Sequence, residues 1–366
     1  MRRGWTSLIL TVVLSAWMTA AAGPRALAVE PPPSVFAPPD RIVVVSDILG
    51  EFGLFAKTLR NAKIIDEDNH WIGGKAHLVI LGNIVGFSQG ILPSYNLVRD
   101  LEKEASAAGG MVHMIRAFGE DQLLHRDIGV VDPGNYSDLA TEDSERRIKE
   151  FTEKGVKEVL ARFPDAPYPD RLTHQYENMM ASDMHPGGVE FLDLFAPGTD
   201  LGDWLRSRNI IIQIGDFLFS HGGLSEKHMN TPLRQINDED RQAVAAATLL
   251  VRLDFDLQSP PWWRDLATKP ELQMQREVET VLAATKTRAQ IVGVSNGLDL
   301  PTHYGLGARV FFVDSGMRAY QMRSAKKKLS SLVIEGDRFT MLWDDKAISA
   351  PTPGPAPQPV AKTDAK

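Results

Sequence analysis

Cysteine is absent from this 366-residue chain, which excludes disulfide bonds, thiolate metal ligands and a cysteine nucleophile. Positive charge is not in excess either: the formal net charge is −7, so a role in binding nucleic acid has no general electrostatic support. After the N-terminal segment, no apolar run is long enough to span a bilayer. Hydrophobic residues make up 43% of the chain, enough for a sizeable core, which excludes a wholly disordered protein.

The first 28 residues have the order of a secretory signal peptide. Arg2 and Arg3 precede an uncharged, mostly apolar run over 7–22, and Ala26–Ala28 offers a small-residue cleavage site. The run is shorter than the roughly 20 residues that a membrane span needs, which favours cleavage over an uncleaved anchor. We therefore expect a periplasmic or secreted protein with no membrane span after cleavage. The paired arginines leave twin-arginine export open as an alternative to the general route.

After a Pro-rich segment over 29–39, expected to be a linker, short apolar runs alternate with helical patterns through residues 40–345. Strands are expected over 41–45, 77–81 and 111–115, with helices over 52–62 and 97–108 between them. This β-α-β-α-β order predicts a layered α/β domain with functional groups at the carboxyl ends of the strands.

The pattern changes to helices and loops over about 129–203, which we expect to form a helical cap over the strand ends. Further strands are expected over 210–214, 217–220, 290–294, 309–314, 331–334 and 338–342, and a further helix over 241–253. The Pro/Ala-rich segment over 346–366 is expected to be a disordered tail.

Strand-end residues Asp47, Asn83 and Arg116, with the tract SHGG at Ser220–Gly223, resemble the motifs of the calcineurin-like metallophosphoesterases. Three further stretches match in order and resemble the bacterial Shewanella-like branch of the serine/threonine-type phosphatases: 195–208, SPPWWRDLA over 259–267, and FFVDSGM over 311–317. The resemblance extends from about 40 to 342. It implies a four-layer fold in which two packed mixed β-sheets are flanked by helices.

The resemblance also implies a reaction centre in which two metal ions, about 3.5–4 Å apart, hold a phosphate and generate hydroxide. A further histidine protonates the leaving group. Among the implied ligands this chain keeps Asp47 and His221. The other family positions carry different residues: Leu49 for a ligand histidine, Asn83 for the bridging aspartate, Gly86 and Phe87 for an Asp-Arg pair, Phe118 for a ligand asparagine, Gly119 for the catalytic histidine, and Val294 for the last histidine.

These substitutions argue against a two-metal centre. Asn83 is neutral, so Asp47 is the one carboxylate left among the implied ligands. Leu49, Phe118 and Val294 have no coordinating atom, and desolvating an ion without ligands is prohibitive. We expect these three side chains to fill the vacated metal cavity as core. No cofactor is expected beyond one weakly bound divalent metal, and phosphatase turnover without metal is not expected.

The remaining polar residues allow alternatives. Asp47, Asn83 and His221 either hold one weak metal or form hydrogen bonds among themselves. Glu120 and Asp121 are either substitute ligands or features of a helix N-terminus.

Two arginines are candidates for binding an anion in the former phosphate pocket. Arg116 follows a strand, and Arg264 follows the paired Trp262 and Trp263, where the resemblance places an anion-binding arginine. The alternative is that Arg264 pairs with a neighbouring carboxylate such as Asp265.

The leading hypothesis is an exported pseudophosphatase that binds a protein or a phosphorylated or other anionic ligand beneath the cap, and no nucleic acid. The alternative is a weakly active or mononuclear metal-dependent phosphoesterase, a hydrolase of phosphoric esters. A third hypothesis is a structural protein of the cell envelope that is tethered by its Pro-rich ends.

Overall fold

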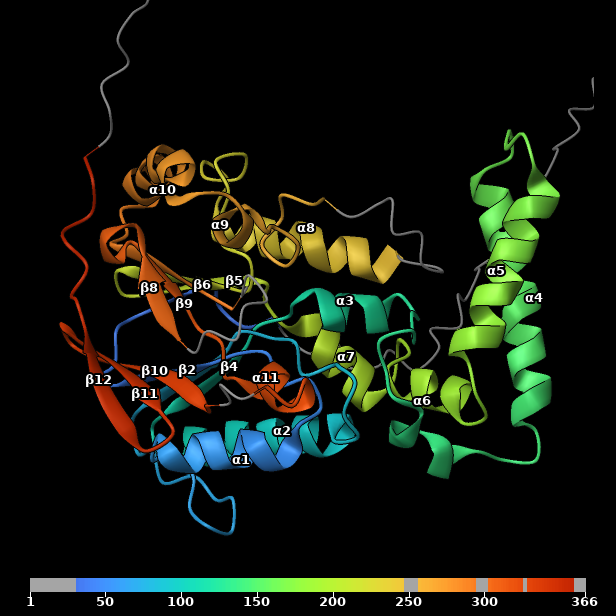
Figure 1. The fold of residues 1–366 in the computed structure, drawn as a ribbon, viewed down its shortest axis with the longest axis horizontal. Coiled ribbons are helices and arrows are strands. Elements are labelled where there is room, and N and C mark those ends of the chain that lie inside the picture. The colour runs from blue at the N-terminus through green and yellow to red at the C-terminus, as the bar shows by residue number, and fades with distance from the viewer. Residues whose placement is uncertain (1–30, 247–255, 294–301, 325–327, 359–366) are drawn as a thin grey trace, which may run out of the picture.

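The computed structural model describes residues 31–246, 256–293, 302–324 and 328–358. Two six-stranded mixed β-sheets pack face to face, and helices cover their outer faces (Figure 1). The expected α/β fold of two sheets flanked by helices is therefore confirmed. The signal-peptide prediction for residues 1–28 lies outside the described residues.

The first sheet has the order β12-β11-β10-β2-β3-β4. Its strands are β2 (Ile42–Val45), β3 (His77–Ile80), β4 (Met111–Met114), β10 (Ser330–Glu335), β11 (Arg338–Trp343) and β12 (Lys346–Ala350). β2, β3 and β4 are parallel, and β10, β11 and β12 are antiparallel to their neighbours. The parallel strands are nearly continuous apolar runs because both of their faces are covered.

The second sheet has the order β1-β5-β6-β7-β9-β8. Its strands are β1 (Val35–Phe36), β5 (Ile211–Ile214), β6 (Phe217–Ser220), β7 (Ala289–Val292), β8 (His303–Gly305) and β9 (Val310–Phe312). The antiparallel hairpin of β5 and β6 and that of β10 and β11 were both expected from sequence and are confirmed.

Alternate residues of the strands fill the space between the two sheets. Val44 and Val79 from the first sheet pack in one buried cluster with Phe219 and Ile291 from the second. Burying each such side chain contributes roughly 1.5–3 kcal/mol. This shared core holds the carboxyl ends of β2, β3 and β6 in fixed relative positions, and the candidate site lies there.

Helices cover the outer faces. They are α1 (Phe52–Asn61) and α2 (Ile91–Ala107) on the first sheet, and α8 (Leu233–Ala246), α9 (Asp265–Thr268) and α10 (Glu271–Thr285) on the second. Phe55 and Leu59, one turn apart, place the apolar stripe of α1 in the same buried cluster as Val43 and Val45. The short helices α3 (Phe118–Leu124) and α11 (Met317–Gln321) follow strands β4 and β9.

The segment over about 129–203 is helical, as expected, and its role as a cap over the strand ends stays a prediction. It consists of the short 3₁₀ turns η1 (Pro133–Asn135) and η2 (Ser137–Leu139), then α4 (Ser144–Arg162), α5 (Pro169–Asp183), α6 (Gly188–Leu194) and α7 (Asp200–Ser207). Figure 1 shows α4 and α5 as a hairpin that projects from the side of the body. Phe151 and Tyr176 belong to the same buried cluster as Phe191, and α4 packs against α6.

Both expected irregular ends contain ordered structure. Within the supposed linker, Val35 and Phe36 form β1 and pair in parallel with β5. The prediction of disorder from residue 346 onward was wrong as far as residue 358, because Lys346–Ala350 is strand β12 and pairs with β11. The backbone carbonyl of Gly354 then accepts a hydrogen bond from Arg309 Nη1 at 2.9 Å. None of the helices in the described ranges is long and apolar enough to cross a membrane.

Candidate functional site

Three strand-end loops build the site. Asp47 follows β2, Asn83 follows β3 and His221 follows β6. The first two loops are joined by backbone hydrogen bonds, from Leu49 N to Asn83 O and from Gly50 N to Ile84 O, both 2.8 Å. Asp47 and Asn83 adopt left-handed backbone conformations, with φ of 51° and 56°. These sharp turns bring their side chains together at the carboxyl edge of the sheet.

The Asn83 carboxamide is the centre of the arrangement. Its Nδ2 donates a hydrogen bond to Asp47 Oδ1 at 2.8 Å and lies 3.2 Å from His221 Nε2. Its Oδ1 accepts a hydrogen bond from Gly119 N at 3.1 Å, which fixes the orientation of the amide. His221 Nδ1 lies 3.0 Å from the Leu81 carbonyl, which can only accept, so Nδ1 carries the proton and Nε2 accepts from Asn83. Both amide hydrogens are therefore used.

Burial changes the charge state of both partners of Asn83. Desolvation, with repulsion from Asp314, raises the pKa of Asp47 to about 8, although Asn83 and nearby arginines act in the opposite direction. Desolvation, with the charge of Arg264, lowers the pKa of His221 to about 3. His221 is therefore neutral at pH 7, as its hydrogen bonds require, and the raised pKa of Asp47 favours the neutral form of its carboxyl.

The residues present do not fit the pair of metal ions that the fold family implies. At the implied bridging position Asn83 directs two N–H donors, and no lone pair, toward Asp47 and His221. Across the described part of the chain, no group of three or more His, Cys, Asp or Glu side chains could hold a metal ion. Val294, at the implied position of the last histidine, lies outside the described residues.

The expectation that Leu49 and Phe118 fill a metal cavity as core was wrong. Both are half-buried and line the edge of the site. The Phe118 ring lies 5.8 Å from the His221 ring and 6.0 Å from the Trp262 ring. Phe87 is 63% exposed.

The two glycines at family positions are required by close contacts. A Cβ atom on Gly86 would lie 2.6 Å from Leu49 Cα, so the two loops pack backbone to backbone. A Cβ atom on Gly119 would lie 3.1 Å from Asn83 Oδ1, the atom that the Gly119 amide already holds. Gly119 thus supports the Asn83 carboxamide.

Glu120 belongs to the N-terminus of α3, and its side chain is fully buried. Its carboxylate accepts backbone hydrogen bonds from Asn83 N at 2.9 Å, Ala117 N at 3.0 Å and Ile84 N at 2.7 Å. It therefore fixes the loop that carries Asn83, and its oxygens are directed at backbone amides rather than at a metal.

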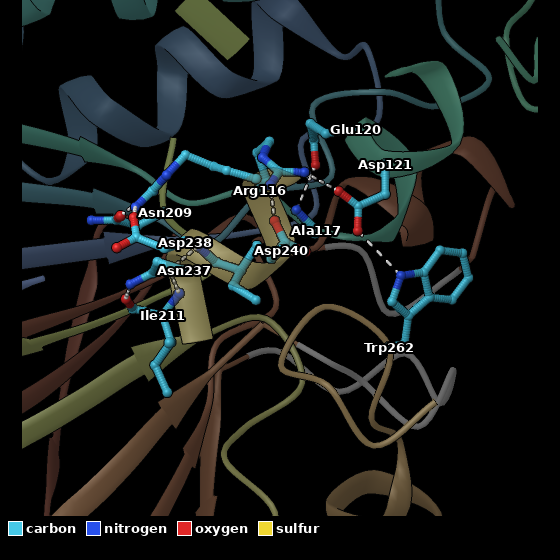
Figure 2. Close-up of polar contacts among 12 residues, drawn as sticks. Arg116, Ala117, Glu120, Asp121, Asn209, Ile211, Asn237, Asp238, Asp240 and Trp262 are labelled. Atoms are coloured by element: carbon cyan, nitrogen blue, oxygen red, sulfur yellow. Dashed lines mark hydrogen bonds and ion pairs between the residues drawn. The ribbon is translucent and has the colours of Figure 1, made fainter. Parts of the chain in front are cut away.

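Arg116 is not available to an anion, contrary to the sequence-based expectation. Its side chain is fully buried, and its guanidinium pairs with Asp121 of α3 and Asp240 of α8 (Figure 2). The other oxygen of Asp121 accepts a hydrogen bond from Trp262 Nε1 at 3.1 Å. These contacts tie β4, α3, α8 and the loop before Arg264 together.

Arg264, in contrast, faces the site. Its guanidinium carbon lies 4.8 Å from the centre of the Phe118 ring, and its Nη1 donates to the Trp263 carbonyl at 3.0 Å. The alternative pairing with Asp265 was wrong, because Asp265 pairs with Lys269 at 2.8 Å. Within the described ranges Arg264 has no ion-pair partner, and its Nε and Nη2 make no hydrogen bond.

Two charged residues near the site, Asp314 and Arg318, were not expected from the sequence. Asp314 is buried and raises the pKa of Asp47, whereas Arg318 acts to lower it. Asp314 lies inside the FFVDSGM stretch that carries the resemblance, so its place near the site could have been predicted from that stretch. Arg318 directly follows the stretch, and no sequence motif points to it.

No protein-family model matches the chain. It is 23% identical over 216 residues to Shewanella-like protein phosphatase 2 of Arabidopsis thaliana, which covers 56% of this chain and 52% of that protein. The chain thus spans about half the length of this curated relative. The crystal structure of the cold-active protein-tyrosine phosphatase of a psychrophilic Shewanella species superposes with a TM-score of 0.64 at 22% identity, covering 87% of this chain and 83% of that one. The chain therefore has the fold of this phosphatase, which is the fold that its sequence resemblance to the calcineurin-like metallophosphoesterases implies.

Proposed function

We propose that this metallophosphoesterase-like protein is a non-catalytic pseudophosphatase that binds a phosphorylated or other anionic ligand at Arg264. One observation carries the non-catalytic part: the Asn83 carboxamide donates to both Asp47 and His221. A bridging metal ligand must offer lone pairs at that point, and phosphate esters hydrolyse too slowly without such assistance. No resident metal pair takes part in this function.

The anion-binding part rests on Arg264. Its guanidinium is held on one side by backbone carbonyls and on one face by Phe118, so its orientation is fixed before a ligand arrives. A guanidinium with free N–H groups pairs well with phosphate or carboxylate oxygens. The charge of Asp47 acts on the pKa of Arg264, and the raised pKa of the Asp47 carboxyl reduces its repulsion of an anion at neutral pH.

A second candidate function is a mononuclear, metal-dependent phosphoesterase. It is favoured by the convergence of Asp47 Oδ1 and His221 Nε2, which lie 2.8 and 3.2 Å from the same nitrogen atom of Asn83. The relative and the structural neighbour are both phosphatases by name. In this alternative Asp47, His221 and the Asn83 oxygen would hold the cation, which would require the carboxamide to turn its oxygen away from Gly119 N.

An activity assay separates the two candidates. Purified mature protein is assayed with p-nitrophenyl phosphate in the presence of Mn²⁺, Zn²⁺ or Fe²⁺, beside the His221→Ala variant. We expect no metal-dependent turnover above that of His221→Ala. His113→Ala is a matched control, since it also removes a buried histidine but on β4, away from the site. Turnover that His221→Ala abolishes and His113→Ala retains would establish the mononuclear enzyme instead.

We also propose that the protein is exported to the periplasm or secreted. Support comes from the basic start, the apolar run and the small residues before Val29. N-terminal sequencing of the protein recovered from outside the cytoplasm should begin at or near Val29. Recovery of the intact chain from the cytoplasm alone would contradict export.

A further inference from the structure

The helix α11 lies directly against the loop that carries Asp47. Gln321 Nε2 donates hydrogen bonds to the Leu49 carbonyl at 3.1 Å and to Ser88 Oγ at 3.0 Å. Just before the helix, Ser315 Oγ accepts a hydrogen bond from Ser46 N at 2.9 Å. Contacts at both ends thus fix α11 against the residues on either side of Asp47.

Arg318 occupies the stretch between these two anchors. It precedes Gln321 by three residues, so both lie on the same face of the helix. Met317 and Ala319 are buried, whereas Arg318 is exposed. In the described part of the chain no carboxylate forms an ion pair with Arg318. An exposed arginine without an ion-pair partner therefore stands on the helix that packs against the Asp47 loop.

Arg318 and Arg264 approach Asp47 from different elements. Arg318 comes from α11 after β9, and Arg264 from the loop before α9. The positive charge of each acts to lower the pKa of the Asp47 carboxyl, so both lie within electrostatic reach of the same point. This effect agrees with the position of α11, which the Gln321 and Ser315 contacts establish independently.

We infer that Arg318 is a second anion-binding residue of this site, and that Arg318 and Arg264 together hold a phosphoryl group. A phosphoryl group carries about two negative charges at neutral pH, and two guanidinium groups neutralise them. A carboxylate carries one negative charge, and one guanidinium group neutralises it. Guanidinium also matches the geometry of phosphate oxygens. This inference rests on the proposed function, because it assumes that Arg264 binds an anion.

Calorimetric titration of the mature protein tests the inference, with inorganic phosphate as the probe and acetate as the carboxylate comparison. We expect phosphate to bind more tightly than acetate, and Arg318→Gln to weaken phosphate binding about tenfold, the usual effect of losing one charge-assisted hydrogen bond. Arg323→Gln is the matched control. Arg323 is also exposed and lies just beyond α11. The Arg323→Gln substitution therefore removes the same charge from a residue that does not face Asp47. Arg318→Lys should retain part of the affinity.

The outcomes separate this inference from the proposed function. If Arg264→Gln weakens phosphate binding and Arg318→Gln binds like Arg323→Gln, the role of Arg318 is overturned and the proposed function stands. If acetate binds as tightly as phosphate, the phosphoryl class is wrong. If the wild-type protein binds neither anion, or Arg264→Gln has no effect, the proposed function itself fails. Circular dichroism of each variant excludes loss of folding as the cause.

Discussion

At the residue scale, the central feature is one carboxamide in place of one carboxylate. The two hydrogens of Asn83 Nδ2 are shared between Asp47 and His221, and its oxygen is held by Gly119. The donors and the acceptor of the carboxamide are thus all paired without an ion. Because buried polar groups are costly when unpaired, this small network specifies the amide at position 83 and disfavours a carboxylate there.

Replacing Asn83 with Asp should therefore destabilise the metal-free protein. The new carboxylate removes both donors and is buried beside another carboxyl, which costs about 3–5 kcal/mol for an uncompensated buried charge. Urea denaturation at pH 7 measures the loss. Asn69→Asp is the matched control: Asn69 also has a left-handed backbone, but its Oδ1 accepts a hydrogen bond from Arg60, so an aspartate is tolerated there. Equal stabilities of the two variants would contradict the account.

The raised pKa of Asp47 predicts a pH dependence of stability. Its value of about 8 in the folded protein lies above the ordinary value of 3.8, so the native state binds more protons than the unfolded state between these pH values. The free energy of unfolding should therefore fall as the pH rises from about 4 to about 8. Asp47→Asn cannot ionise and should flatten this fall. Urea denaturation at pH 5 and pH 8.5 compares the two proteins, and an unchanged slope would show that Asp47 does not titrate in this range.

At the element scale, a buried ion pair fixes the helices around the site. Arg116 pairs with Asp121 and Asp240, and Asp121 also holds the Trp262 indole (Figure 2). Because the Trp262 loop continues into Arg264, α3 and α8 determine where the proposed anion-binding group lies.

Asp121→Asn should destabilise the protein by about 3–5 kcal/mol, because it leaves the guanidinium of Arg116 buried with one carboxylate fewer. The control is Asp100→Asn, which breaks an exposed pair with Lys103 and should cost less than about 1 kcal/mol. Chemical denaturation of both variants provides the measurement. A loss for Asp121→Asn no larger than that for Asp100→Asn would show that the buried pair does not hold these helices.

The helical hairpin of α4 and α5 depends on one glycine. A Cβ atom on Gly155 would lie 2.1 Å from the Tyr176 hydroxyl oxygen, so Gly155→Ala should separate the two helices and increase hydrogen exchange across the hairpin. Gly53 in α1 has no neighbouring atom within 4 Å of its Cβ position, and Gly53→Ala should stabilise the protein by up to about 1 kcal/mol. Protection of the hairpin that is unchanged in Gly155→Ala would contradict this packing.

At the scale of the whole molecule, much of the fold could be predicted from the sequence. Apolar runs such as Arg41–Val45 are bounded by polar turns and identify their strands without tertiary information. Lys346–Ala350 could not be identified in this way, because its side chains are mostly exposed and its strand pairing comes from β11 alone. The direction of the helical hairpin depends on packing against α6, which no local pattern encodes.

The sequence was enough to predict which residues form the candidate site, but not which contacts these residues make. The resemblance placed Asp47, Asn83 and His221 together, and they do meet. Arg116 and Arg264 have the same residue type, yet one is enclosed by carboxylates and the other is not. That difference depends on Asp240, which is distant in the sequence and gave no signal.

The decisive measurement is the metal content of the purified mature protein, determined by inductively coupled plasma mass spectrometry after incubation with Mn²⁺, Zn²⁺ and Fe²⁺ and then desalting. We expect the bound metal to stay well below one ion per chain, because Asn83 provides donors where a bridging ligand must accept. Two tightly bound ions per chain would contradict this expectation.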